Sequence, residues 1–191
     1  MNFDSPAPKY LSTVEWSPDP TRPGCTMSSL AFIRQEPLLS HYAPLLDTLD
    51  INWDKYGVDI RSGYMRPNCY FGIPWWHADY NRPNAKLGGP MFYYVKTAPR
   101  VAPLMYYTGQ VEMGRRWGDL DQERYDADAK ELDEGVWAQF HPLVLHRASE
   151  SRSSGARLFV RVRPMTTYRN VVEHSCMVYA DIAKAKRDGT W

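Results

Sequence analysis

Residues 157–163 read Arg-Leu-Phe-Val-Arg-Val-Arg, which is the period-two alternation of a β-strand. Successive side chains of a strand point to opposite faces of its sheet. One face of this strand carries three aliphatic side chains: Leu158, Val160 and Val162. The opposite face carries one aromatic and three cationic side chains: Arg157, Phe159, Arg161 and Arg163. The stretch therefore predicts a strand with one face on an apolar core and the other in a polar setting.

Several other stretches have strand character and are separated by turn residues such as Gly88-Gly89. They are Val58–Met65, Asn68–Ile73, Pro90–Lys96, Leu104–Val111, Val136–Phe140 and Leu143–Arg147. The chain has 14% aromatic residues and 15 prolines, a composition that suits pleated surfaces and frequent turns. We therefore predict a mainly β fold, a sandwich or barrel.

Helical spacing of apolar residues is confined to residues 29–50, where Pro37 and Pro44 interrupt it. This predicts one or two short flanking helices. Residues 1–26 are rich in Pro, Ser, Thr and Asp, which indicates an extended N-terminal arm or loop. With 191 residues in all, the remaining 27–191 are expected to form a single domain.

The segment Asp119–Glu134 is strongly acidic, which favours a solvated surface helix or loop, although a lid over a pocket is an alternative. The whole chain has a formal net charge of only +1, so no global attraction to nucleic acid or to an acidic membrane is expected. Its three cysteines show no CxxC spacing, and its first residues do not resemble a signal peptide. These features favour a cytoplasmic protein that does not bind membranes.

The clearest indication of a functional site is found in residues 73–80, Ile-Pro-Trp-Trp-His-Ala-Asp-Tyr. His77 and Asp79 are two residues apart, so on a strand their side chains share one face and can reach the same metal ion. By itself the triplet is a weak motif, because a surface histidine near an aspartate gives the same pattern.

A metal site needs a third ligand, and four other histidines are candidates: His41, His141, His146 and His174. His146 is preferred because it ends the apolar run 142–146, where a buried imidazole needs a polar or metal partner. A hydrogen-bonded core histidine is the alternative interpretation. Two histidines and one carboxylate on one face of an octahedron are typical of non-haem Fe(II) oxygenases, whereas zinc hydrolases also use such sets.

The face of residues 157–163 that carries the arginines indicates which kind of molecule the site could bind. A row of guanidinium groups is costly to bury without anions, so it suits the inner wall of a cavity that binds carboxylates. An exposed sheet face with solvated arginines remains the competing interpretation.

His77-x-Asp79, the downstream His146, and Arg157 eleven residues later together resemble the Fe(II)/2-oxoglutarate-dependent dioxygenase superfamily. The spacing is most similar to that of the taurine dioxygenase and phytanoyl-CoA hydroxylase groups. The resemblance covers about residues 58–164 and implies a double-stranded β-helix, or jelly-roll, core.

The resemblance also implies roles for single residues. His77, Asp79 and His146 would hold iron, and Arg157 would pair with the C5 carboxylate of 2-oxoglutarate. Arg161 would assist with cosubstrate or with an anionic substrate group. A hydroxyl group that supports the arginine would come from one of several strand residues: Tyr93, Tyr106, Tyr94, Tyr107 or Thr108. Three aromatic residues beside the motif are candidates for a substrate wall or for plain packing: Trp75, Trp76 and Tyr80.

The resulting functional prediction is an oxidoreductase, a 2-oxoglutarate-dependent dioxygenase that hydroxylates a small molecule or a protein residue and releases succinate and CO₂. Three alternatives remain open at this stage. They are a cupin-like metalloprotein without 2-oxoglutarate, an oxygenase acting on nucleic-acid bases, and a binding module that has lost the chemistry.

Overall fold

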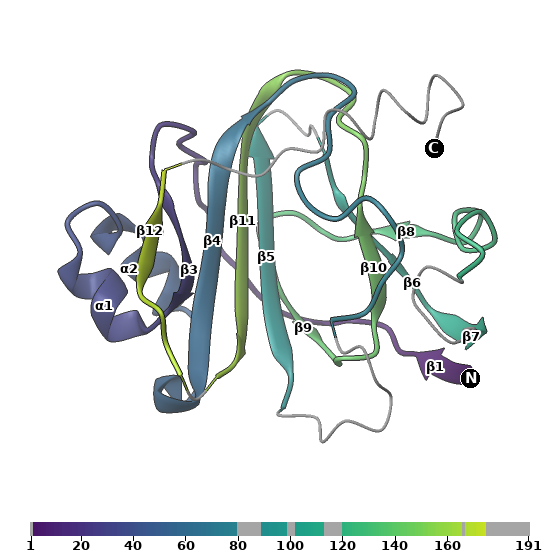
Figure 1. Cartoon of the computed structure of the whole chain (residues 1–191), viewed down its shortest axis with the longest axis horizontal. Helices are drawn as coiled ribbons and strands as arrows, with labels where there is room; N and C mark the ends of the chain where they lie inside the picture. Colours follow the sequence, from purple (N-terminus) through teal and green to yellow (C-terminus); the bar gives the residue numbers. More distant parts are fainter. Residues whose placement is uncertain (1, 80–88, 99–101, 113–119, 166, 175–191) are drawn as a thin grey trace.

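A computed structural model describes residues 2–79, 89–98, 102–112, 120–165 and 167–174 (Figure 1). Its regular structure is mainly β, with a few short helices, as the sequence predicted. The strands form antiparallel sheets, and the two larger ones face each other in Figure 1. Among the described residues, no helix is long and apolar enough to cross a membrane.

The large sheet has seven strands in the order β12-β3-β4-β11-β5-β9-β2. Their bounds are β12 (Val171–Glu173), β3 (Gly24–Ser28), β4 (Tyr56–Met65), β11 (Gly155–Pro164), β5 (Met91–Ala98), β9 (Val136–Phe140) and β2 (Lys9–Thr13). The predicted strand 157–163 lies within β11 at the centre of this sheet, where it pairs with β4 on one side and β5 on the other. Residues 156–162 of β11 are therefore fixed in register against two neighbours.

The smaller sheet has the order β10-β6-β8, formed by β10 (Leu145–Ala148), β6 (Leu104–Tyr107) and β8 (Lys130–Glu131). Two isolated bridges, Tyr70↔Glu150 and His77↔His146, attach the segment 70–77 to this sheet at and just beyond β10. A separate pair joins β1 (Asn2–Ser5) to β7 (Gly109–Glu112).

The two faces of β11 enter different environments, as the alternation predicted. The aliphatic face packs under α1 (Leu30–Gln35), α2 (Ala43–Leu46) and the 3₁₀ turn η1 (Ser40–Tyr42), with η2 (Trp53–Lys55) nearby. This core includes Ile33, Leu45, Val160 and Trp137, all fully buried. The opposite face meets the inner core between the two sheets: Met91, Tyr93, Val95, Leu104, Tyr106, Leu132, Ala138, Phe140 and Val144.

The helical stretch 29–50 divides into short pieces, as its two prolines predicted. Ser29 caps α1, because its side chain accepts a hydrogen bond from the backbone N–H of Phe32. Pro44 lies in the first turn of α2, where its missing N–H leaves no intrahelical hydrogen bond unmade.

Two segments differ from the sequence-based description. Residues 1–26, expected as an arm or loop, contain β1 and β2 and most of β3, each hydrogen-bonded to a strand of the body. The expected boundary at residue 26 falls inside β3. In the acidic segment, residues 120–134 form turns and β8, so the expected surface loop is found and not a helix. It differs from a fully solvated loop because it buries Leu120, Tyr125 and Leu132.

Replacing Trp137 with Ala should lower the free energy of unfolding by about 3–5 kcal/mol. The indole is fully buried between the large sheet and the helices, and its Nε1 donates a hydrogen bond to Thr48 Oγ1 at 2.9 Å. Urea denaturation followed by circular dichroism measures the change. Leu38→Ala, at a residue that is 43% exposed, is the control and should change stability by less than about 0.5 kcal/mol.

Candidate metal centre

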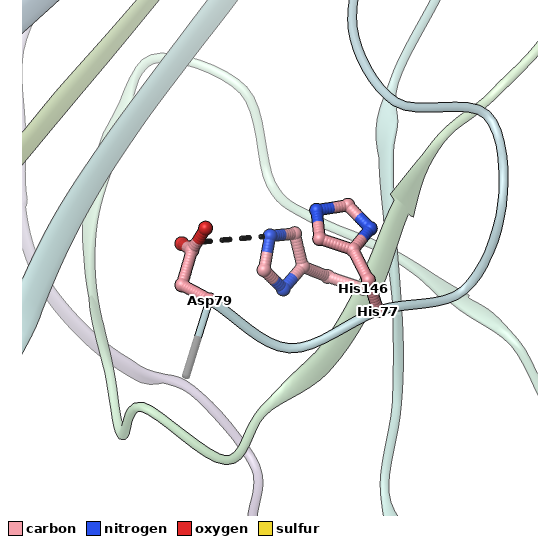
Figure 2. Close-up of side chains that lie close together, drawn as sticks. All are labelled: His77, Asp79 and His146. Atoms are coloured by element: carbon pink, nitrogen blue, oxygen red, sulfur yellow. Dashed lines mark ion pairs between the residues drawn. The ribbon is translucent and has the colours of Figure 1, made fainter. Parts of the chain in front are cut away.

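His77 and His146 are brought together by their backbones. The N–H of His77 donates to the carbonyl of His146 at 3.0 Å, and the N–H of His146 donates to the carbonyl of His77 at 2.8 Å. Residues that exchange both hydrogen bonds in an antiparallel pair lie directly opposite each other and project their side chains to the same face. The two imidazole rings consequently lie side by side, with centroids 4.5 Å apart (Figure 2).

The orientation of each ring is fixed by a local hydrogen bond. Nδ1 of His77 lies 2.9 Å from the carbonyl of Trp75, and Nδ1 of His146 lies 2.9 Å from the carbonyl of Val144. A carbonyl oxygen only accepts, so in each neutral ring Nδ1 carries the proton and Nε2 keeps its lone pair. Hydrogen bonds of this type commonly orient the rings of metal-binding histidines and fix their tautomer.

Asp79 completes the grouping from two residues beyond His77. Its Oδ2 lies 3.8 Å from Nε2 of His146. One potential ligand atom from each of His77, Asp79 and His146 lies within 4.8 Å of the others. The sequence-predicted triad therefore converges on one point in the fold.

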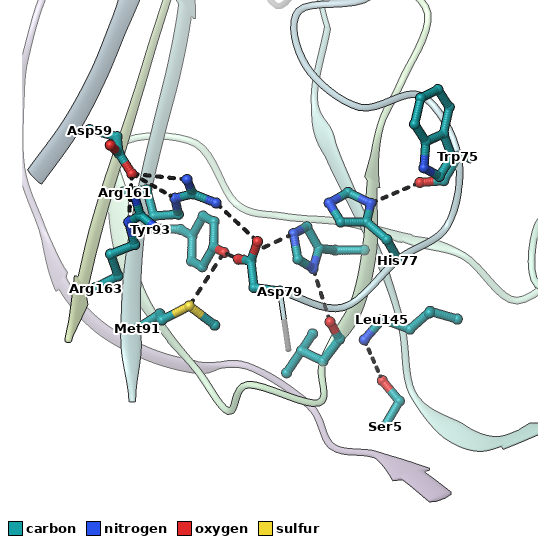
Figure 3. A network of polar contacts seen from close by, with 12 residues as sticks. Ser5, Asp59, Trp75, His77, Asp79, Met91, Tyr93, Leu145, Arg161 and Arg163 are labelled. Atoms are coloured by element: carbon teal, nitrogen blue, oxygen red, sulfur yellow. Dashed lines mark hydrogen bonds and ion pairs between the residues drawn. The ribbon is translucent and has the colours of Figure 1, made fainter. Parts of the chain in front are cut away.

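The carboxylate of Asp79 is held by two side chains of the large sheet (Figure 3). Nη1 of Arg161 donates to Asp79 Oδ1 at 2.9 Å, and the hydroxyl of Tyr93 donates to Asp79 Oδ2. The resemblance implied that Arg161 assists with cosubstrate or with an anionic substrate group, and it made Tyr93 one candidate for the hydroxyl group that supports the arginine. In this structure their direct partner is the carboxylate of the triad, and both also line the adjoining cavity.

Asp59 extends this charge network to the next strand. Its carboxylate is 4% exposed, and its Oδ2 accepts from Nε and Nη2 of Arg161 at 3.1 and 2.9 Å. Burial tends to lower the pKa of Arg161, but Asp79 and Asp59 outweigh this effect and raise it. Burial likewise tends to raise the pKa of Asp79, and the neighbouring charge of Arg161 reverses this, so the pKa lies below its usual value. Asp79 is thus an anion at neutral pH, as metal coordination requires.

Burial also controls the protonation of His77. It lowers the pKa of this imidazole from 6.5 to about 4, and the neighbouring His146 adds to the shift. At neutral pH the ring is therefore uncharged and its Nε2 lone pair is available. Two imidazole nitrogens and one carboxylate oxygen form a donor set that fits a divalent transition-metal ion.

A cavity of about 120 Å³ adjoins the two imidazoles. The described residues that line it are Arg61, Phe71, Gly72, Ile73, His77, Tyr93, Leu104, His146, Ala148, Arg157, Phe159 and Arg161. Arg157 is 1% exposed, and its guanidinium group donates to the carbonyls of Ala102 at 2.9 Å and Phe71 at 3.1 Å. The same group lies over the rings of Phe71 and Phe159. Arg157 therefore faces the cavity with the two histidines and does not extend into bulk water.

Tyr106 is placed differently from its predicted role beside the arginine. It lies opposite His146 in the β6–β10 pair but is not among the described residues that line the cavity. Tyr10 lies beside it; burial, with a smaller contribution from Tyr106, raises the pKa of Tyr10 to about 12.

The other hydroxyl candidates bind elsewhere. Tyr94 faces the helices and donates to the carbonyl of Val14, Tyr107 donates to the carbonyl of Gln110, and Thr108 accepts from Lys130. The alternation of β5 places Tyr93 and Tyr94 on opposite faces of the sheet. Choosing between the two tyrosines therefore requires knowing which face is turned towards the cavity.

The aromatic residues beside the motif are also divided. Trp76 is fully buried in a cluster with Phe3 and Val111, where its Nε1 donates to Asp126 Oδ1 at 2.7 Å. It therefore packs in this core and does not line the cavity. Trp75 contributes the carbonyl that orients His77, and Tyr80 lies outside the described residues.

Two functional features were not singled out from the sequence. Asp59 lies on the polar face of β4, a position that the alternation Val58-Asp59-Ile60 signals. The carbonyls of Phe71 and Ala102 that hold Arg157 have no sequence signal, because every residue has a carbonyl group.

No protein-family model and no curated protein matches this chain. The site is therefore interpreted from its own geometry.

Replacing His146 with Ala should weaken the binding of Mn(II) at least about a hundredfold, because it removes one of three ligands. Isothermal titration calorimetry of metal-free protein measures the affinity. The matched control is His141→Ala, at an exposed position near β10, which should leave the affinity unchanged. Equal affinity in both variants would contradict the assignment.

The metal-free protein should lose stability as the pH falls from about 6.5 towards 4. In this window the unfolded chain takes up a proton at His77 while the folded protein, whose pKa is about 4, does not. The loss should approach about 3 kcal/mol. Urea denaturation at several pH values in a chelator measures it, and His77→Gln should flatten the profile in this range. A His77→Gln profile as steep as that of the wild type would show that another group controls the transition.

Proposed function

We propose that this protein is an Fe(II)- and 2-oxoglutarate-dependent oxygenase that hydroxylates a small molecule or a protein residue and releases succinate and CO₂. The proposal depends on one observation. His77, Asp79 and His146 converge beside a cavity that also contains the guanidinium group of Arg157.

The donor set supports the choice of metal. Three protein ligands on one face of an octahedral ion leave three positions for other molecules, which is enough for a bidentate cosubstrate and O₂. The fixed Nδ1–H tautomers direct both Nε2 lone pairs to the same place. Arg161 and Tyr93 hold the carboxylate in position before a metal binds, which reduces the reorganisation that coordination requires.

Arg157 supports the choice of cosubstrate. Arginine recognises a carboxylate through parallel N–H donors, and a preorganised cation in a buried site binds an anion more strongly than one in water. Two carbonyls and two aromatic rings already fix this guanidinium group. A dicarboxylate that binds the metal at one end and Arg157 at the other would occupy the cavity.

The strand order supports a double-stranded β-helix core. Along the chain, β4 and β5 belong to the large sheet, and the metal-bearing segment between them pairs with β10 of the smaller sheet. After β6 and β8 in the smaller sheet, β9 returns to the large sheet, β10 to the smaller and β11 to the large. Chain segments that alternate between two facing sheets in this way are typical of jelly rolls.

When bound, iron and 2-oxoglutarate would activate O₂, which is the oxidant, because loss of CO₂ from the 2-oxo acid supplies two of the electrons that reduce it. The protein's own contribution is geometric and electrostatic. Its histidines and Asp79 hold the ion, Arg157 orients the cosubstrate, and the apolar part of the cavity wall, including Phe71, Leu104 and Phe159, limits access of water. The resemblance of the sequence to the Fe(II)/2-oxoglutarate-dependent dioxygenases also implies that a carboxylate at residue 79 favours hydroxylation over halogenation.

The alternatives make different demands on the same residues. A cupin-like metalloprotein without 2-oxoglutarate would need the triad but not Arg157. A binding module would need neither. An oxygenase of nucleic-acid bases would share the chemistry and would differ in its substrate, so oligonucleotides belong in the substrate screen beside amino acids and nucleosides.

The test follows succinate release by anaerobically iron-loaded protein after O₂ is admitted, with and without 2-oxoglutarate. His146→Ala should abolish iron-dependent succinate formation. Arg157→Ala should raise the dissociation constant of 2-oxoglutarate roughly 10- to 100-fold, because it removes charge-assisted hydrogen bonds, while iron binding is retained. The charge-transfer absorption of the Fe(II) complex on titration with 2-oxoglutarate measures this constant.

Arg152→Ala is the control, because this arginine side chain is 72% exposed and pairs with Glu131 away from the cavity. It should leave 2-oxoglutarate binding unchanged. An unaltered 2-oxoglutarate requirement in Arg157→Ala would end the assignment of Arg157 to the cosubstrate. Iron binding by the wild type without any 2-oxoglutarate-dependent succinate release would favour the cupin-like alternative.

A further inference from the structure

A second hollow lies beside Asp79. It has a volume of about 140 Å³, and the described residues that line it are Asp79, Met91, Arg161, Arg163 and Pro164. The imidazoles and Arg157 line the first cavity, Asp79 and Arg163 line the second hollow, and Arg161 lines both. We propose that this hollow binds an anionic group of a small-molecule substrate, a carboxylate or a phosphate, through Arg163. This inference rests on the proposed function for its statement that the bound molecule is the substrate.

The order of residues along β11 separates the two binding places. Arg157, Arg161 and Arg163 share one face of this strand, and the rise of a strand is about 3.3 Å per residue. Arg157 and Arg163 are thus separated by about 20 Å of strand, with Arg161 and its partner Asp79 between them. Figure 3 shows Arg163 and Met91 near Asp79, on the side away from His77.

Occupancy of the first cavity leaves the second hollow for the substrate. A dicarboxylate that joins the metal to Arg157 would fill the cavity of about 120 Å³. A substrate must still reach the metal, because the oxidised bond has to lie next to it. The hollow beside Asp79 adjoins the metal centre without overlapping Arg157.

Two arginines and two aspartates lie in this region, so their charges balance before a metal binds. All three nitrogens of the Arg161 guanidinium group have partners, since Nε and Nη2 bind Asp59 and Nη1 binds Asp79. Arg163 has to share Asp59 with it, and its Nε lies 3.0 Å from Asp59 Oδ2 without hydrogen-bond geometry. The side chain of Arg163 is 31% exposed and lines the hollow, so its guanidinium group is accessible from there.

Metal binding would create an excess of positive charge in this region. When Asp79 coordinates a divalent cation, less of its negative charge compensates Arg161. Asp59, which is buried and also accepts from the N–H of Met27, then faces both arginines. A substrate anion at Arg163 would restore the balance and would bind best after the metal.

The experiment measures the binding of acetate and of methyl phosphate, separately, to protein saturated with Mn(II) and 2-oxoglutarate. Isothermal titration calorimetry gives the affinity. One of the two anions should bind saturably, and Arg163→Met should weaken it about tenfold or more. Arg163→Lys should retain part of the affinity because it keeps the charge but loses the planar fork. Arg34→Met, on α1 at the opposite face of the sheet, is the control for loss of one positive charge and should have no effect.

The outcomes separate this inference from the proposed function. If 2-oxoglutarate binds but neither anion binds saturably, the anion site is wrong while the oxygenase proposal stands. The same conclusion follows if Arg163→Met binds the anion with the affinity of the wild type. If 2-oxoglutarate does not bind, and the anion still binds the Mn(II)-loaded protein in an Arg163-dependent way, the oxygenase proposal fails and the anion site is retained. Unchanged Mn(II) affinity and melting temperature in Arg163→Met exclude a general loss of structure as the cause.

Discussion

The pair of backbone hydrogen bonds between His77 and His146 is the interaction on which the candidate site depends. These bonds attach the segment that carries His77 and Asp79 to the strand that carries His146. Without them the imidazoles would have no reason to share a face, and the cavity between the two sheets would lose one wall. A backbone pair is well suited to this task, because it sets the positions of both side chains and leaves their ring nitrogens available.

A second constraint comes from the large sheet. β11 is hydrogen-bonded on both sides over most of its length, so the positions of Arg157 and Arg161 are determined by two registers at once. The register places Asp59 and Tyr93 on either side of Arg161. The neighbouring strands therefore bring the groups that hold Asp79 together. Rigid strands fix a site more accurately than loops do, because their backbones are cross-linked.

Buried charge would ordinarily oppose folding, and here it is distributed over a connected set. The charges alternate in sign from Asp59 on β4 through Arg161 on β11 to Asp79 at the candidate metal centre. Each charge in the chain stabilises the next, which offsets the desolvation of all three. The same arrangement keeps Asp79 ionised, and burial keeps His77 neutral, so both are in the protonation states that can bind a metal.

The amino-acid sequence was sufficient to predict the mainly β class and the strand at 157–163 with its two unlike faces, because alternation is a local property of the chain. It also named His77, Asp79 and His146 as candidate ligands, but their convergence depends on the long-range pairing of His77 with His146. It did not determine that residues 1–26 contribute strands, since strand pairing depends on partners far along the chain. The partners of Arg157, Arg161 and Tyr93 were likewise decided by the tertiary structure. A side chain's face follows from its own strand, whereas what lies opposite that face depends on how the sheets pack together.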